Sequence, residues 1–505
     1  MTSDRSSKGF AEIELKLALP GSEHAGLAQA LGRTPLLARR KPSLQPLHNV
    51  YYDTPAQTLR AQRIALRLRR VGVGAQAHWL QTLKIGGASD SALSQRGEWE
   101  TPLAGPQLSA PALLDTPWSG IDPDGSVLAK LAPCFVTHFE RTIWLVRRRD
   151  RSVVEVALDL GRIQAGGNTA AIAELEFELR AGPVEALFDV ARTIAASVAV
   201  LPLNQSKAQR GYALAQGTLE APQRAQPPRL SPDLALPEAA MQVLREAFSQ
   251  FCSNLFRLQT SDATELVHQA RVGWRRFRSS LSLFKAALAQ RPPPPRLDLN
   301  DLLDRLGELR DLDVARTQTL PGLAQAYVGG DGRRAQAWRA MERVLAQATR
   351  GQRAAVLEAM QQPALGASLL AFTHWLQGPD RSSSVSVDRD DQAVALRDWS
   401  RQRIRRLHQR LQAALHEPAS DQARHRSRIL AKRLRYGIEA LRPLLPQRRA
   451  QAWYDEALEI QSSIGAARDA QQASRLLAKL GVERELQAFV RGLAAGRAPV
   501  TPLSN

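Results

Sequence analysis

The sequence predicts an α+β multidomain protein, in which an N-terminal eight-stranded antiparallel β-barrel tunnel is followed by an all-α helical bundle with an internal two-fold repeat. Three observations predict this fold class. Up to residue 216, apolar and polar residues alternate with the period of β-strands. From Pro237 to about residue 495, apolar residues follow the helical period, and two segments of this part match each other. We therefore expect domains at 9–216 and 238–495, joined by a Pro-rich linker at 217–237.

The strand runs place charges of both signs on one face. In the first run, Glu12, Glu14 and Lys16 alternate with apolar residues. Later runs place on one face Arg67, Arg69, Lys84, Glu98, Glu100, Glu155, Asp159, Glu174, Glu176 and Glu178. Each such face alone is also typical of a strand that meets water. One face of a closed barrel must point inward, however, so the number of such strands favours a charged tunnel.

Clustered glutamates and basic residues indicate a specific chemistry. Glutamates that lie close together repel one another and raise one another's pKa. A divalent cation bound between them relieves this repulsion. Mg²⁺ and Mn²⁺ prefer oxygen ligands, and Arg and Lys bind phosphate. A metal ion together with basic residues is the usual apparatus of phosphoryl transfer, so the tunnel is a candidate active site for a phosphate compound.

Composition narrows the partners and the location. The chain has 505 residues, of which 68 are basic and 49 acidic, a formal net charge of +19. Residues 1–220 carry 25 basic and 21 acidic residues, whereas residues 221–505 carry 43 and 28, so a polyanion is the expected partner of the second half. No apolar run reaches the length of a transmembrane helix, the N-terminus lacks a signal-peptide pattern, and Cys134 and Cys252 are too few for a disulfide framework. We expect a cytoplasmic protein with no membrane partner.

The helical half contains a repeated basic motif. Residues 267–278 and 424–435 share the form H-x-x-R-x-x-x-[RK]-R-x-R, and a G-x-x-R-D segment follows each at Gly307 and Gly465. The expected repeat halves are about 238–330 and 392–495. On a helix, each motif forms one stripe, composed of His268, Arg271, Arg275 and Arg278 or of His425, Arg428, Lys432 and Arg435. A solvated face is the plain alternative. The stripes lack acidic partners four residues away, so we expect an anion to join them across a cleft.

The first half resembles the CYTH domain, the triphosphate tunnel metalloenzyme family. The motifs that carry the resemblance are E-x-E-x-K at 12–16, Tyr51–Thr54, R-x-R at 67–69, T-x-K at 82–84, E-x-E-x-E at 174–178 and S-K-x-x-R-G-Y at 206–212. The resemblance implies that triphosphate is bound by Lys16, Arg67, Arg69, Lys84, Arg141, Lys207 and Arg210. It implies Mg²⁺ or Mn²⁺ held by Glu12, Glu14, Glu174 and Glu176, with Glu12, Glu14, Lys84 and Glu176 in catalytic roles. Glu98, Glu100, Glu155, Asp159 and Glu178 would be further ligands or would orient water and basic residues.

The second half resembles the CHAD domain, the conserved histidine α-helical domain, which implies a basic surface that binds inorganic polyphosphate. Nucleic acid is disfavoured as a partner, because helical spacing places Trp274, Phe277 and Tyr436 in the core, away from base stacking. The two resemblances together imply a protein similar to bacterial inorganic triphosphatases.

The expected activity is metal-dependent hydrolysis of inorganic triphosphate to pyrophosphate and phosphate. The helical half is expected to tether the protein to polyphosphate, which would place it at polyphosphate granules in the cytoplasm. A nucleoside or thiamine triphosphatase or an adenylate cyclase in the same tunnel remains an alternative, as does a non-catalytic polyphosphate scaffold. The linker at 217–237 should let residues 1–216 act alone.

Overall fold

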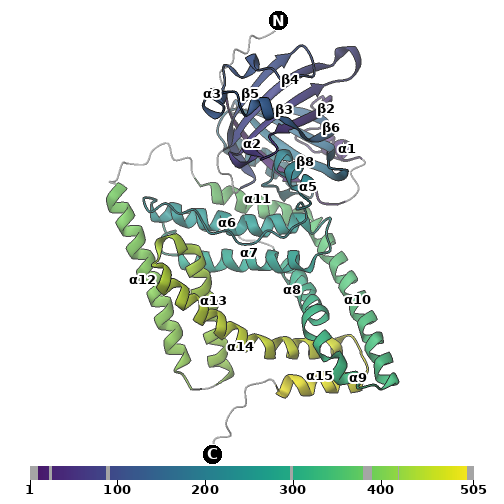
Figure 1. The fold of residues 1–505 in the computed structure, drawn as a ribbon, viewed down its shortest axis with the longest axis vertical. Coiled ribbons are helices and arrows are strands. Elements are labelled where there is room, and N and C mark those ends of the chain that lie inside the picture. The colour runs from purple at the N-terminus through teal and green to yellow at the C-terminus, as the bar shows by residue number, and fades with distance from the viewer. Residues whose placement is uncertain are drawn as a thin grey trace, which may run out of the picture.

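A computed structural model describes residues 10–21, 26–86, 91–295, 299–378, 389–418 and 420–496. The β-barrel lies at one end of the molecule, and the helices extend from it as a frame-like arrangement (Figure 1). The barrel is followed by a mostly helical region, so the predicted fold class is confirmed. None of the helices in these ranges is long and apolar enough to span a bilayer.

Eight antiparallel strands close the barrel in the order β5-β4-β3-β2-β6-β7-β8-β1, and β1 pairs again with β5. A short ninth strand, β9, adds to one end of β1. The strands are β1 (Phe10–Ala18), β2 (Ser43–Asp53), β3 (Ile64–Val71), β4 (His78–Gly86), β5 (Leu93–Leu103), β6 (Ala132–Arg147), β7 (Val153–Ala165), β8 (Asn168–Ala181) and β9 (Leu201–Pro202). Closure leaves no free edge among the eight and separates an inner face from an outer face.

Short helices cover the outside and one mouth of the barrel. They are α1 (Leu27–Gly32), α2 (Thr58–Ala61), α3 (Trp118–Ile121), α4 (Glu185–Ala195) and α5 (Lys207–Ala215). Helix α4 buries its apolar side, including Leu187 and Phe188, in one cluster with Leu15, Val156 and Phe177 of the strands. The alternate residues of those strands point into the tunnel, which is why a period of two in the sequence separates core from site.

The helical region contains ten α-helices in the described ranges. They are α6 (Leu236–Arg257), α7 (Thr264–Leu283), α8 (Asn300–Val314), α9 (Ala324–Val328), α10 (Gly332–Met360), α11 (Pro363–Gln377), α12 (Arg389–Leu415), α13 (Asp421–Leu441), α14 (Gln447–Lys479) and α15 (Arg484–Gly496). Helices α11 and α6 lie nearest the barrel, and α7 packs on the far side of α6 (Figure 1). The two matching sequence segments form corresponding helices, since each basic motif lies on α7 or α13 and each G-x-x-R-D segment lies on the following α8 or α14.

The barrel and the helices share hydrophobic core. Leu370 of α11 is fully buried in the cluster formed by the barrel and α4, whereas Leu201 and Leu203 are buried in the cluster of α6 and α7. A Cβ atom on Gly366 of α11 would lie 2.5 Å from the carbonyl oxygen of Val200, so only glycine permits this close approach. The two parts are therefore packed against each other over an apolar junction.

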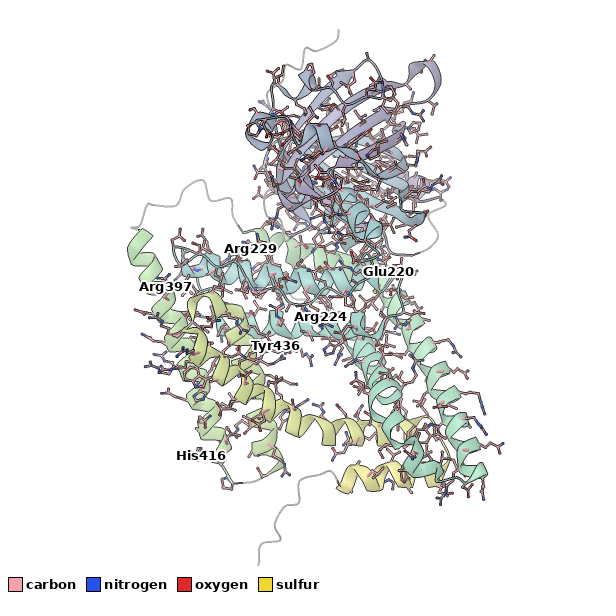
Figure 2. All side chains as sticks on the ribbon, viewed as in Figure 1. Glu220, Arg224, Arg229, Arg397, His416 and Tyr436 are labelled. Atoms are coloured by element: carbon pink, nitrogen blue, oxygen red, sulfur yellow. The ribbon has the colours of Figure 1, made fainter. Side chains whose placement is uncertain are left out.

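The Pro-rich segment, which precedes α6 in the chain, runs along α6 and is held there by hydrogen bonds. We call residues 217–230 the strap. The backbone N–H of Gln223 donates to Asn254 Oδ1 at 3.0 Å, and Asn254 Nδ2 donates back to the Gln223 carbonyl at 2.9 Å. The N–H of Gln226 donates to Glu246 Oε1 at 3.0 Å. Figure 2 labels Glu220 and Arg224 along this segment. These bonds to α6 fix the strap between the domains.

Candidate functional site

The inner face of the barrel carries the charged residues that the sequence analysis selected. Strand register opposes unlike charges, since Lys84 pairs with Glu98, Arg141 with Asp159 and Lys16 with Glu176 across neighbouring strands. Lys84 Nζ lies 3.1 Å from Glu98 and 2.9 Å from Glu12. The tunnel is therefore polar and its charges largely neutralise one another. Because register is a long-range property, the sequence could predict the residues but not these pairs.

Glu12 and Glu14 of β1 contact basic residues of β1 itself, β4 and β5. Glu14 contacts Lys16 and accepts from Arg96 Nη2 at 2.7 Å. Glu12 lies 3.6 Å from Arg96 Nε. Arg96 was not selected from the sequence, although it lies on the same face as Glu98 at a spacing of two residues. That spacing was the signal that could have identified it.

Three carboxylates at the α5 end of the tunnel lie closest together. Asp159, Glu174 and Glu176 each offer an oxygen within 4.8 Å of the others, and Asp159 and Glu174 are fully buried. Lys207 of α5 points into this group, with its Nζ 2.6 Å from Asp159, 2.5 Å from Glu174 and 2.9 Å from Glu176. The ammonium thus lies among the three carboxylates, where a cation is stabilised. Burial alone would lower the pKa of Lys207, but these three carboxylates raise it above the usual range.

The donor set of this group suits a divalent metal ion. Carboxylate oxygens that converge on one cation are the ligands that Mg²⁺ and Mn²⁺ prefer. Of the four predicted metal ligands, Glu174 and Glu176 lie in this group, together with Asp159. Glu12 and Glu14 lie along β1, and Lys16 bridges Glu14 to Glu176 with a 3.2 Å contact to the latter.

Other predicted phosphate-binding residues surround the carboxylates. Arg141 donates from Nε to Asp159 at 2.7 Å and also contacts Glu176. Arg210 of α5 is 2.9 Å from Glu174. Although burial raises the pKa of Glu176, Lys16, Lys207 and Arg141 outweigh it and hold that pKa well below the usual range. These residues are therefore charged partners of one continuous network.

Arg67 and Arg69 of β3 form the wall with the least compensated positive charge. Arg67 lies 3.5 Å from Glu98, whereas Arg69 donates to the neutral Asn49 Oδ1 at 2.7 Å. Within the described residues, Arg69 has no ion pair with a carboxylate. Burial, followed by the neighbouring Arg67 and Arg141, lowers the pKa of Arg69 to about 10. A bound anion would offset both the cost of burying Arg69 and its repulsion by Arg67 and Arg141.

The acidic residues of less certain role lie on the edge of this network. Glu98 pairs with Lys84 and Arg67, and Glu100 accepts from Thr82 Oγ1 at 3.1 Å. Arg180, which was not selected from the sequence, lies 2.9 Å from Glu155 and 2.5 Å from Glu178. Burial above all, and then Glu12 and Glu155, raise the pKa of Glu178 to about 8 although Arg180 opposes this.

The two basic stripes of the helical half approach each other. Helices α7 and α13 are in contact, and burial, followed by nearby cations that include Arg275 on α7, lowers the pKa of both Arg428 and Lys432 on α13. We define the basic cluster by Arg271, Arg275, Arg310, Arg428, Lys432 and Arg468. Burial, and then Arg428, Arg275 and Arg468, lower the pKa of Lys432 to about 8. The cluster thus contains mutually repelling cations from both repeats.

Three of the remaining residues of the two stripes are not part of the basic cluster, because they are exposed or have an acidic partner. Arg278 and His425 are exposed. Arg435 lies 3.3 Å from Glu439, four residues along the same helix, and stacks over Tyr436. The expectation that both stripes lack such an acidic partner is therefore wrong for Arg435, because the pair obeys the ordinary helical spacing.

The structure shows the surroundings of two further residues of the repeated motifs, His268 and Gly307. Burial, and then Arg310, lower the pKa of His268 to about 4, so this imidazole is neutral near pH 7. A Cβ atom on Gly307 would lie 2.9 Å from Arg271 Nη1. Glycine in the G-x-x-R-D segment therefore makes room for the guanidinium of the stripe. The side chains of residues 463–467, which include Gly465 of the second G-x-x-R-D segment, lie outside the described part of the structure.

Comparisons with known proteins identify both parts. Residues 11–212 match the model of the CYTH domain, and residues 242–478 match the model of the CHAD domain. The chain therefore contains a CYTH domain followed by a CHAD domain. Over 204 residues it is 36% identical to an inorganic triphosphatase of Haemophilus influenzae, with 40% of this chain and 54% of that protein covered. The chain thus spans about half the length of this curated relative.

Solved structures with similarity to each part also exist. The CHAD domain of the plant Ricinus communis is 28% identical, covers 56% of this chain and 93% of that chain, and has a TM-score of 0.46. A candidate adenylyl cyclase from Hippeastrum with a dominant triphosphatase activity is 18% identical, covers 40% of this chain and 95% of that chain, and has a TM-score of 0.28.

Proposed function

We propose that the tunnel hydrolyses inorganic triphosphate to pyrophosphate and phosphate with the help of a divalent metal ion. The observation that carries this proposal is the wall of Arg67 and Arg69 that faces a carboxylate group centred on Asp159, Glu174 and Glu176 within one closed barrel. Simple capture of an anion would need the arginines but not the carboxylates. The similarity to an inorganic triphosphatase supports the same substrate.

In this proposal the chain's own residues bind and orient the substrate. Arg67, Arg69 and Lys84 hold phosphate oxygens by charge-assisted hydrogen bonds and neutralise charge as one P–O–P bond breaks. Water supplies the new oxygen of the released phosphate, and pyrophosphate leaves. The carboxylates of Asp159, Glu174 and Glu176 would hold Mg²⁺ or Mn²⁺. When bound, such a metal ion neutralises phosphate charge and acts as a Lewis acid.

Phosphate release by the purified full chain tests the proposal. Triphosphate should give a higher kcat/KM than ATP or thiamine triphosphate, and excess chelator should abolish turnover. Cyclic AMP as the main product from ATP would instead favour the cyclase alternative. Absence of phosphate release from all substrates with added Mg²⁺ and Mn²⁺ would favour the non-catalytic scaffold.

We further propose that the basic cluster binds inorganic polyphosphate. The side-chain Nε atoms of Arg275 and Arg428 are buried without a hydrogen-bond partner within the described residues, and their neighbours are mainly cations. A polyanion that contacts both helices would relieve this repulsion and release counterions, so the affinity should fall steeply with salt.

Polyphosphate affinity of the full chain tests this second proposal. The double variant Arg275→Gln with Lys432→Gln should bind far more weakly than the wild type. The matched control replaces the exposed Arg339 and Arg350 of α10 by Gln, which removes the same charge elsewhere on the helices. Equal losses in both double variants, or displacement by single-stranded DNA at equal phosphate concentration, would show a general polyanion surface instead.

A further inference from the structure

The tunnel cavity continues beyond the barrel into the junction between the domains. Its volume is about 1680 Å³, and its lining includes the strap residues Thr218 and Arg224 and also Arg257 at the end of α6. Small-molecule sites have volumes of about 300–1,000 Å³. The cavity therefore has room beyond a single triphosphate, and part of its wall belongs to the helical domain.

Arg257 is a buried cation without a matching anion. Its side chain is 8% exposed, its Nε donates to the carbonyl of Leu219 at 3.1 Å, and its Nη1 donates to the carbonyl of Ser253 at 3.1 Å. No carboxylate forms an ion pair with it in the part of the chain that the structure describes. Buried charges in proteins are usually paired, because desolvation without a partner is costly. Burial lowers the pKa of Arg257, in line with this lack of compensation.

Two other arginines near Arg257 are either paired with a carboxylate or exposed to solvent. Arg210 is 2.9 Å from Glu174, and its guanidinium stacks over Phe256, the neighbour of Arg257. The Arg224 side chain is 75% exposed and reaches Glu265 only at 4.0 Å. Arg257 thus has the unmatched charge on the buried wall, and Arg224 provides a second guanidinium that is free to approach a ligand in the cavity.

We propose that Arg257 and Arg224 form a phosphate subsite where the helical domain closes the α5 end of the tunnel. The guanidinium fork of arginine suits two-pronged binding of a phosphate group. The proposal rests on the proposed triphosphatase function and deepens it. The phosphate comes either from the end of a chain longer than triphosphate or from released orthophosphate, and the same chemistry recognises both.

Steady-state kinetics of the full chain distinguishes these sources. Arg257→Gln should raise KM for tetraphosphate about ten-fold, the loss expected for one charge-assisted contact, if the chain end binds there. If the subsite instead binds the released product, Arg257→Gln should weaken inhibition by orthophosphate about ten-fold. In that case the KM values for triphosphate and tetraphosphate should both stay unchanged. Arg257→Lys, which keeps the charge, should restore much of either effect.

Two further variants separate binding from folding. Arg224→Gln removes an exposed side chain without a buried contact, and it should change the same parameter roughly two- to five-fold. Arg353→Gln is the matched control, because Arg353 also donates to backbone carbonyls, those of Ser261 and Asp262, but does not line the cavity. The subsite is refuted if Arg257→Gln and Arg224→Gln behave as Arg353→Gln does in both assays.

Failure of the proposed function would be recognised separately. If the wild type hydrolyses no triphosphate, calorimetric titration with orthophosphate still tests the subsite. Weaker binding to Arg257→Gln than to wild type and Arg353→Gln would support the subsite, whereas equal binding to all three would overturn it.

Discussion

Leu370→Ala should weaken the barrel, although Leu370 lies far outside the barrel sequence. The Leu370 side chain is 0% exposed and belongs to the apolar cluster of the barrel and α4. Three carbons are lost, which corresponds to about 2.4 kcal/mol of transfer free energy at about 0.8 kcal/mol per carbon. A cavity term increases this to about 3–4 kcal/mol, within the usual range for a buried leucine. The expected fall in Tm is about 6–16 °C for a domain of about 200 residues.

Hydrogen exchange of the full chain, resolved by peptide, measures this effect where it should occur. Amides of β7 and β8 should lose protection in Leu370→Ala. Leu369→Ala is the matched control, because Leu369 is equally buried but belongs to the cluster of α6 and α7. The shared-core reasoning is refuted if Leu370→Ala leaves protection of β7 and β8 unchanged while Leu369→Ala lowers that of α6.

This prediction revises the expectation that residues 1–216 act alone. Removal of the helices would expose Leu201 and Leu203 and would release the bonds that hold the strap to α6. Helix α5, which supplies Lys207 and Arg210 to the tunnel, lies between these two points. We therefore expect full activity only from the intact chain.

Three further predictions concern the tunnel and the basic cluster. Glu14→Gln should lose most triphosphate turnover and keep its circular dichroism, because Glu14 is buried between Lys16 and Arg96; full turnover would remove Glu14 from the site. Gly307→Ala should leave Tm unchanged or higher, since alanine favours helices by about 1 kcal/mol, yet its methyl group displaces the Arg271 guanidinium and should weaken polyphosphate binding; unchanged affinity would contradict this. The pKa of Lys432 is about 8 in the free protein, and a bound anion raises it, so polyphosphate affinity should be highest below pH 8 and fall as pH rises above it. Lys432→Arg should remove this pH dependence, and a wild-type affinity that is flat from pH 7 to 10 would refute it.

The barrel was predictable because charged residues occupy every second position along several of its strands. Strands β1, β3 and β8 were recognised in this way, whereas β2 carries neutral inward residues such as Asn49 and Tyr51 and offered only a short motif. The residues of the tunnel were predictable, but their pairing was not. Lys16 contacts Glu14 in its own strand and Glu176 across the sheet, and only the register brings the latter close.

The junction of the domains was not predictable from sequence patterns. The proline content of the strap predicts a linker between two domains, yet its backbone is bound by Asn254, Glu246 and Arg257 of α6. Such contacts depend on where α6 lies relative to the barrel, which neither helical period nor motif spacing specifies. In contrast, the pair of Arg435 and Glu439 was within reach of the ordinary helical spacing and was overlooked.

The two basic sites differ in how their charge is compensated, and this difference fits their proposed roles. Tunnel cations such as Lys207 and Arg141 already contact carboxylates, so a phosphate substrate must compete with internal partners. We expect that competition to lower the affinity of the tunnel for phosphate. Lys432 and Arg428 in the basic cluster face mainly other cations, and their pKa values are lowered first by burial and then by that repulsion. An anion bound there would relieve this repulsion, and its acidic competitors, Asp311 and Asp469, are outnumbered by the cations of the cluster. The charge of the cluster therefore supports its proposed role, which is salt-sensitive retention of a polyanion.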